Sequence, residues 1–249
     1  MKLGKTPARA GAVKLRLSSY LNKAALPKLP ARFGHETLVT DWGMLGNDQF
    51  GDCVWAGAAH ETRMWCAEAG APVAFTDKAV LSDYAAVTGF NPDDPNTDQG
   101  TDMQAAASYR RKTGIADASG HRHKVEAYLA LKPGDLTEHY YAMYLFGAVG
   151  IGIEFPASAM DQFNAGKPWS VVSRAKIEGG HYIPLVAKRA HLECVTWGSL
   201  QAMTVGFFQK YNDESVAYVS AEALANNKSP EGFDLTTLLA DLKAVTAAR

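Results

Sequence analysis

The sequence is poor in cysteine and lacks a long apolar run, and both features narrow the class of protein. Its three cysteines are an odd and low number for 249 residues: Cys53, Cys66 and Cys194. This argues against a disulfide-stapled scaffold and for a reducing compartment. The longest apolar run, 142–153, is broken by glycines and is too short to cross a bilayer. The N-terminus lacks the apolar core of a signal peptide. We therefore expect synthesis in the cytoplasm and no membrane partner.

The composition is that of an ordinary globular protein. Hydrophobic residues make up 47% of the chain and charged residues 20%. A chain of this length can bury a substantial core as one large domain or two lobes. We find no internal repeat and no low-complexity tract.

Charge is distributed unevenly along the chain. Residues 1–35 contain several lysines and arginines and no acid, although the whole chain has a net charge of −1. Pro7, Pro27 and Pro30 punctuate this stretch, so we expect an extended basic arm, called the arm below. It could dock on an acidic surface, act as a pro-like extension or stay solvated. Nucleic acid is disfavoured because the basic residues are not interleaved with aromatic ones.

The stretch 44–56 begins as a glycine-punctuated loop and becomes a helix at Asp52 or Cys53. Asp52 is expected to cap that helix through its side chain, and Gly70 to end it. Cys53 then lies in the first turn, where free N–H groups and the helix dipole favour a thiolate. A thiolate is nucleophilic, so this is a candidate catalytic cysteine. The alternative is an inert buried thiol.

The periodicity divides the chain into a helical part, 36–145, and a strand-rich part, 146–249. This order predicts an α+β fold with a cleft where two lobes meet. Helices are predicted over 53–69, 76–87, 101–112 and from Asp234 onward; strands are predicted over 147–155, 181–188, 192–197 and 215–220.

A second cluster lies far downstream of Cys53. It consists of a Gly-Gly pair followed by His181, and a Val-Thr pair followed by Trp197 and Gly198. In papain-type enzymes the catalytic His and Asn follow the cysteine by about 130 to 150 residues. His181 and Trp197 lie at comparable separations from Cys53.

At these residues the sequence resembles the papain-like cysteine peptidases. Cys53 matches the family's nucleophile, although Val54 stands between it and Trp55, a pair that is usually adjacent. His181 matches the base, and Trp197 begins the family's Trp-Gly pair. The resemblance implies a two-lobed papain-like domain over 36–249, preceded by the arm.

The resemblance also implies a mechanism of acyl transfer. Cys53 would attack a carbonyl and His181 would move the proton. The oxyanion would be bound by the Cys53 N–H and the amide of Asn47, six residues earlier. Gln49, four residues earlier, is the substitute donor.

Two further positions resemble substrate-contacting residues, and one catalytic position departs from the family. Gly100 matches the glycine-lined substrate wall, and Trp197 is expected beside His181. The Asn that orients the histidine usually lies two residues before the tryptophan, where this chain has Val195. Thr196 is adjacent but is expected to point to the other face of the strand. The residue that orients His181 is therefore unassigned.

We expect no metal and no other cofactor. Cys53 and Cys66 lack the spacing of zinc ligands. The His-Arg-His triplet at 121–123 lies in a charged loop, where we expect it to be solvated.

Several short motifs, including the loop 46–48 and the Gly-Gly-His, more narrowly resemble papain-like proteins of tailed bacteriophages and prophages. We therefore predict a phage- or prophage-encoded cysteine hydrolase that cleaves a peptide or amide bond of a peptide or protein substrate. The alternative is a virion structural protein with weak or no activity. It would be made in the host cytoplasm and docked through the arm on capsid or tail proteins. Cys53 and His181 favour the hydrolase, whereas Val195 and the basic arm favour the alternative.

Overall fold

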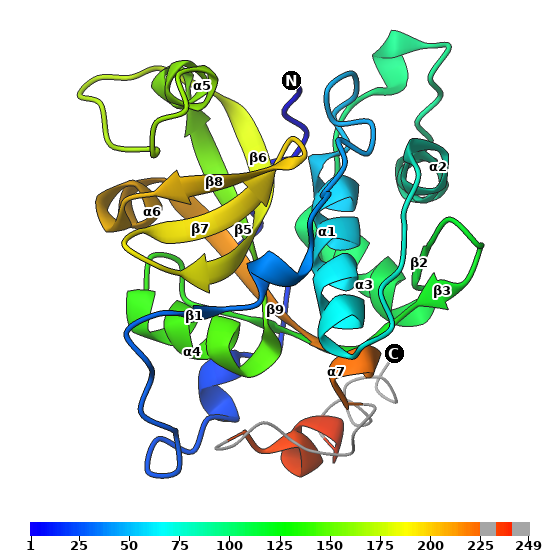
Figure 1. Cartoon of the computed structure of the whole chain (residues 1–249). Helices are drawn as coiled ribbons and strands as arrows, with labels where there is room; N and C mark the ends of the chain where they lie inside the picture. Colours follow the sequence, from blue (N-terminus) through cyan, green and yellow to red (C-terminus); the bar gives the residue numbers. More distant parts are fainter. Residues whose placement is uncertain (225–232, 241–249) are drawn as a thin grey trace.

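The computed structural model describes residues 1–224 and 233–240. Helices pack against one large antiparallel sheet, and the helix α1, Cys53–Glu68, lies between that sheet and α2, Asp77–Thr88 (Figure 1). The helices are η1 Leu17–Ser19, η2 Glu36–Leu38, α1 Cys53–Glu68, α2 Asp77–Thr88, η3 Pro95–Thr97, α3 Met103–Lys112, α4 Leu136–Phe146, α5 Ala157–Asn164, α6 Val205–Tyr211 and α7 Ala221–Leu224. The strands are β1 Phe33–Gly34, β2 Ile115–Ala116, β3 Arg122–His123, β4 Val125–Ala130, β5 Val149–Pro156, β6 Ile177–Lys188, β7 Leu192–Thr196, β8 Ser199–Met203 and β9 Asn212–Ser220.

The large sheet has the strand order β4-β9-β5-β6-β7-β8, and β1 pairs with β6. Its neighbouring strands are antiparallel. The central strand β5 is almost wholly buried because apolar cores lie on both faces. One core includes α4, α5 and α6, and the other lies between the sheet and α1.

The structure confirms the predicted α+β class, and several boundaries follow from local chemistry. Thr76 caps α2 by accepting from the Ala79 N–H at 3.2 Å, and Asp102 caps α3 by accepting from the Ala105 N–H at 2.8 Å. Asp234 accepts from the Thr237 N–H at 2.9 Å, as a capping residue should. The rest of that predicted C-terminal helix lies partly outside the described residues.

Other elements differ from the sequence prediction. The strand expected to begin at His181 begins at Ile177. The strands β4 and β8 and the helices α4, α5 and α6 were not predicted. β4 pairs with β9 in the large sheet, so a strand from the part predicted to be helical completes that sheet.

Asp52 occupies the N-cap position of α1, but its side chain forms no cap hydrogen bond within the described structure. Its carboxylate is buried and turned toward the preceding loop, since a Cβ on Gly46 would lie 3.1 Å from Asp52 Oδ2. Burial raises the pKa of Asp52 well above its usual value, which favours the neutral acid. The predicted side-chain cap is therefore wrong, although the backbone carbonyl does accept the first helical bonds from Trp55 and Ala56.

A buried polar cluster joins α1 to the sheet and to α3. Glu61 accepts from Arg110 at 2.6 Å and from the Tyr182 hydroxyl at 2.7 Å. The Arg110 guanidinium lies 3.8 Å from the centre of the Tyr218 ring. The cluster connects α1, α3, β6 and β9, and it therefore fixes the two structural halves that carry the candidate site.

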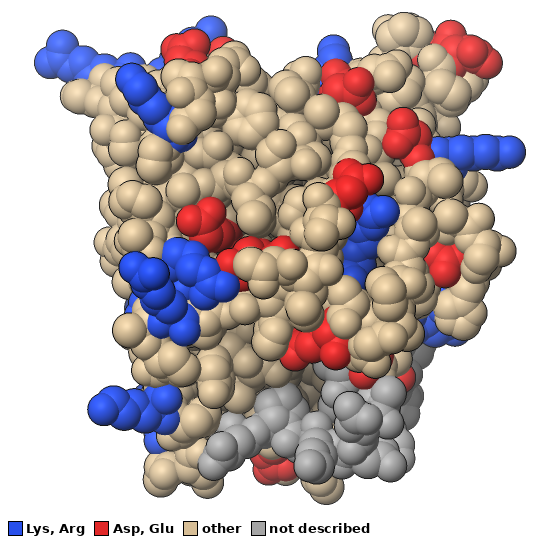
Figure 2. Space-filling view, viewed as in Figure 1, with Lys and Arg blue, Asp and Glu red and all other residues tan. Residues whose placement is uncertain are grey.

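The arm packs on the domain at several points along its length. Leu17, Tyr20 and Phe33 are buried, and the Ala130 N–H donates to the Leu15 carbonyl at 2.8 Å. On the face shown in Figure 2, most basic side chains lie toward the left edge, and several of them lie together at mid-height beside acidic ones. None of the helices in the described part of the chain is long and apolar enough to span a membrane.

Candidate active site

Cys53 is the first residue of α1 and is only 1% exposed. Its Sγ accepts a hydrogen bond from the Tyr182 N–H at 3.4 Å. Tyr182 directly follows His181 in β6, so the start of α1 packs against the part of β6 that carries the histidine. The two candidate catalytic residues, distant in sequence, thus belong to adjoining backbone segments.

His181 is held by one hydrogen bond and one ring stack. Its Nε2 pairs with Thr196 Oγ1 at 2.8 Å. Its ring stacks on Trp197, with centroids 4.6 Å apart and planes 21° apart. Nδ1 has no hydrogen-bond partner among the described residues, so His181 and Cys53 are not hydrogen-bonded to each other in this structure.

Thr196 is therefore the residue that contacts His181 Nε2, a partner that the sequence left unassigned. The expected alternation along β7 is present: Cys194 and Val195 belong to the cores on opposite faces of the sheet. The expectation that Thr196 points away from His181 is wrong, because the two side chains lie on the same face of the sheet. After Thr196 the strand ends, and Trp197 adopts a left-handed backbone with φ 44°, which turns its ring over His181.

The two predicted oxyanion donors differ in their surroundings. Asn47 is 2% exposed, and its Nδ2 donates to the Phe50 carbonyl at 3.0 Å. Gln49 is exposed. The Asn47 amide is thus fixed within the loop that leads into α1, whereas Gln49 points into solvent.

The first six residues, called the cover segment, lie across this site. Its backbone is held at Lys2, whose N–H donates to the Asn47 carbonyl at 3.0 Å and whose carbonyl accepts from Trp197 Nε1 at 3.2 Å. It is held again at Lys5, whose N–H donates to the Gly180 carbonyl at 3.1 Å. In Figure 1 the chain accordingly starts beside the upper end of α1, next to the sheet.

Glycines allow the cover segment to approach so closely. A Cβ on Gly100, which has φ +73°, would lie 2.2 Å from the Gly4 carbonyl oxygen. A Cβ on Gly4 would lie 1.7 Å from the Gly51 carbonyl oxygen. Gly100 therefore lies against the protein's own N-terminal residues, and its role in a substrate wall stays a prediction.

Both candidate catalytic groups are in their neutral forms in this buried site. Burial raises the pKa of the Cys53 thiol to about 12. Burial also lowers the pKa of His181 to about 3. A thiol and a neutral imidazole are the expected species near neutral pH, so the covered site does not contain a ready thiolate.

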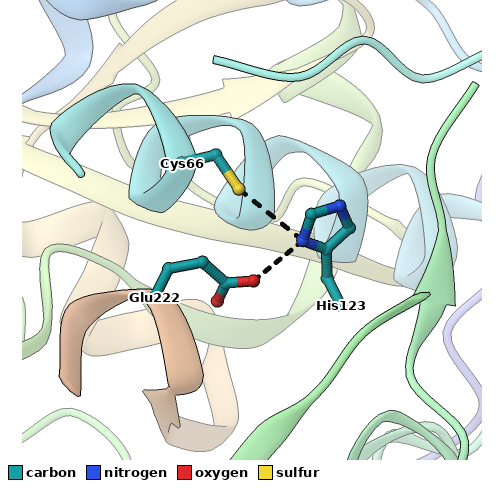
Figure 3. A group of neighbouring side chains, drawn as sticks. All are labelled: Cys66, His123 and Glu222. Carbon is teal, nitrogen blue, oxygen red and sulfur yellow. Dashed lines mark hydrogen bonds and ion pairs between the residues drawn. The ribbon is translucent and has the colours of Figure 1, made fainter. Parts of the chain in front are cut away.

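A second cysteine–histidine cluster lies away from this site, at the far end of α1. Figure 3 shows Cys66 and Glu222 pointing toward Nδ1 of His123, at 3.7 Å and 2.8 Å. Asp117 Oδ2 lies 3.2 Å from the other ring nitrogen. The contacts with Cys66 and Glu222 raise the pKa of His123 to about 10.

This cluster corrects the expectation of a solvated His-Arg-His triplet, since His123 is buried, whereas His121 and Arg122 are exposed. The ligand atoms of Cys66, His123 and Glu222 lie within 4.8 Å of one another and could hold a metal ion. They also satisfy each other directly, as a hydrogen-bonded network joining α1, β3 and α7.

Comparison with solved structures identifies the fold. Xylellain, a cysteine protease from Xylella fastidiosa, matches with a TM-score of 0.68 and 13% identity over 88% of this chain and 96% of that chain. A procathepsin B from Trypanosoma congolense matches with a TM-score of 0.63 and 12% identity, over 88% and 86%. A Carica candamarcensis cysteine protease in complex with E-64 matches with a TM-score of 0.54 and 11% identity, over 77% and 99%.

No protein-family model and no curated protein sequence matches the chain. The structural matches confirm the predicted papain-like fold. At these identities they establish the fold alone.

Proposed function

We propose that this chain is a papain-like cysteine hydrolase that cleaves a peptide or amide bond, with Cys53 as nucleophile and His181 as base. The observation that carries the proposal is the hydrogen bond from the Tyr182 N–H to Cys53 Sγ at 3.4 Å. This bond holds the thiol of Cys53, the first residue of α1, against the backbone next to His181. The similar solved structures are themselves cysteine proteases by name.

The mechanism follows from the groups present. His181 Nδ1 takes the proton of Cys53, and the thiolate attacks the carbonyl carbon of the substrate. The Cys53 N–H and the Asn47 amide stabilise the oxyanion, with exposed Gln49 as the weaker candidate. His181 then protonates the leaving amine. Water hydrolyses the thioester, releases the acid and restores the thiol.

Three other residues support these steps without reacting. Thr196 holds His181 Nε2, so the imidazole keeps its orientation while Nδ1 gains and loses the proton. Trp197 covers the ring and excludes water from it. Gly100 lets an extended chain lie close to the wall of the site.

The covered structure is proposed to be the latent form of the enzyme. The cover segment must leave before a substrate can reach Cys53, and its departure would hydrate the thiol and lower its pKa. Two similar structures are procathepsins by name, which supports a form that is folded before it is active.

The test uses a protein that folds with its cover segment in place and is then opened. A specific protease site inserted between Pro7 and Ala8, both exposed, allows residues 1–7 to be cut free; we call the product the cut protein. We expect the cut protein to hydrolyse peptides and the uncut protein not to. Cys53→Ala should abolish hydrolysis, whereas Cys194→Ala, a core thiol elsewhere, should retain it. Hydrolysis that survives Cys53→Ala, or a folded cut protein inert toward varied peptides, would contradict the proposal.

The second candidate is a phage or prophage virion protein that uses the papain fold structurally. The observation that favours it is the tight cover over Cys53, which would then be permanent. The arm also keeps exposed cations that could meet an acidic capsid or tail surface, among them Lys14, Lys23 and Lys28. The protein would be made in the host cytoplasm and carried in the particle.

This candidate predicts that purified particles contain the chain and lose it when those three lysines are changed to glutamate. Deleting the arm is a poor test, because Leu17 and Phe33 belong to the core. Particles that lack the wild-type chain in quantitative mass spectrometry would contradict the structural role.

A further inference from the structure

The cover segment places one side chain in a closed, acidic pocket. The side chain of Lys5 is 0% exposed. Its Nζ lies 2.8 Å from Asp213 Oδ2 and 3.3 Å from Glu214 Oε1, and it donates to the Thr6 carbonyl at 3.0 Å. Each of the three ammonium protons therefore has an acceptor.

The backbone around Lys5 is held by bonds that do not depend on the side chain. The Lys5 N–H donates to the Gly180 carbonyl, and the Thr6 N–H donates to the Thr101 carbonyl at 3.1 Å. The Thr101 N–H in turn donates to the Gly4 carbonyl at 2.7 Å. Most peptides lying here could make such bonds, so sequence preference must come from the pocket.

The shape of the pocket suits a long, unbranched side chain. Gly152 in β5 forms its wall, and a Cβ there would lie 2.0 Å from Lys5 Cε and 2.7 Å from Asp213 Oδ1. A larger residue at 152 would block the channel. The glycine therefore leaves room for the alkyl chain of lysine and leads its head to the carboxylates.

The charge of the pocket suits a cation. Asp213 and Glu214 are adjacent, and their side chains are only 22% and 21% exposed. Burial raises the pKa of Glu214 and Asp213 adds to the rise, whereas Lys5 lowers it. An empty pocket, or one filled by an apolar side chain, would leave two like charges facing each other in poor contact with water.

We infer that, once the cover segment has left, Asp213, Glu214 and Gly152 form a specificity pocket that selects peptides with a lysine at the position of Lys5. The pocket takes an ammonium in preference to a guanidinium, because the carboxylates of Asp213 and Glu214 converge on the single nitrogen of Lys5, whereas arginine presents a broader planar fork. The inference rests on the proposed function for its role in substrate choice. The binding preference itself does not require catalysis.

The experiment measures binding apart from cleavage. The cut protein carrying Cys53→Ala is freed of residues 1–7 and titrated with a fluorescent peptide of the same seven residues. A Lys5→Met peptide should bind about tenfold more weakly or worse, because charged hydrogen bonds are lost. A Lys5→Arg peptide should also bind more weakly than the parent. Lys2→Met is the matched control, since the Lys2 side chain is exposed, and it should bind as the parent does.

Changing the pocket should erase the preference. With Asp213→Asn and Glu214→Gln together, the parent peptide and the Lys5→Met peptide should bind alike. Equal binding of these two peptides to the unaltered pocket, or a preference that persists in the double variant, would overturn the inference. Equal binding of the Lys5→Arg peptide and the parent peptide would overturn the assignment to lysine.

A release measurement covers the case in which residues 1–7 stay bound after cutting. Their dissociation rate is followed by native mass spectrometry for the parent, Lys5→Met and Lys2→Met chains. Lys5→Met should dissociate faster, and a rate equal to that of the parent would also overturn the inference. Lysine-selective binding without hydrolysis would refute the proposed function and leave the pocket standing. Hydrolysis without lysine preference would support the proposed function and refute the lysine pocket.

Discussion

At the scale of single residues, Thr196 shows that the partner of a histidine can differ from the one that the sequence pattern led us to expect. The hydroxyl of Thr196 lies 2.8 Å from His181 Nε2 and supplies the contact that Val195 cannot. The sequence could predict that a histidine, a tryptophan and a nearby polar residue belong together. It could not predict that the side chains of His181 in β6 and Thr196 in β7 lie on the same face of the sheet, because that depends on how β6 and β7 pair.

Replacing Thr196 by Val should remove the hydrogen bond while keeping the shape of the side chain. We expect kcat of the cut protein to fall roughly 10- to 100-fold, since a hydrogen bond to a group that becomes charged contributes about 1.5 to 3 kcal/mol. Thr196→Ser should restore most of the rate, because it keeps the hydroxyl. A Val variant with unchanged kcat and an unchanged pH–rate profile would show that Thr196 does not orient the histidine.

At the scale of elements, the arm and α1 depend on contacts that local sequence does not encode. The cap of α2 at Thr76 was predictable because a cap acts within one turn, whereas α3, predicted to begin at 101, is capped by Asp102 and begins at Met103. The course of the arm was not, since Lys2 and Lys5 meet Trp197 and Gly180 from distant strands. Hydrophobic periodicity also could not reveal that β4 joins the large sheet.

Gly4→Val should loosen the cover segment, because a Cβ at Gly4 would lie 1.7 Å from the Gly51 carbonyl oxygen. The labelling rate of Cys53 by a thiol reagent in the uncut protein should rise at least about tenfold, as expected when a clash of about 1.4 kcal/mol or more shifts the closed state toward open. Ala8→Val, at an exposed position, is the control and should not change the rate. Equal rates for Gly4→Val and the parent would show that this contact does not protect Cys53.

Arg110→Met tests the polar cluster that joins α1 to the sheet. Glu61 would remain buried without its cation, so the free energy of unfolding should fall by about 3 to 5 kcal/mol. Lys112→Met, an exposed cation on the same helix, should change it little. Adding Glu61→Leu to Arg110→Met should recover part of the loss in urea denaturation. A loss no larger than that of Lys112→Met would mean that the ion pair contributes little.

At the scale of the whole molecule, three buried histidines make stability depend on pH. Burial lowers the pKa of His60 to about 4, of His139 to about 4 and of His181 to about 3, from an ordinary value of 6.5. Below pH 6.5 the unfolded chain therefore binds protons that the folded chain does not. The free energy of unfolding should decrease as the pH falls from 6.5 toward 4, by up to about 1.4 kcal/mol per pH unit for each histidine.

Urea denaturation of the parent and of His139→Gln between pH 7 and pH 4 checks this dependence. In the variant, the free energy of unfolding should change less steeply with pH, by the contribution of one histidine, since glutamine does not titrate. His123 acts in the opposite range: its pKa is raised to about 10, so its contribution should decline as the pH rises from 6.5 through 10. Identical slopes for the parent and His139→Gln would contradict the assignment of a buried neutral histidine.

The central claim is that Cys53 is a catalytic thiol hidden by the cover segment. The most direct measurement is intact-mass analysis after exposure to E-64, performed on the uncut and the cut protein at the same pH. The account predicts one adduct, mapped to Cys53, that forms quickly in the cut protein, slowly or not at all in the uncut protein, and is lost with His181→Ala. A cut protein that has released residues 1–7 and still leaves Cys53 unmodified would contradict it.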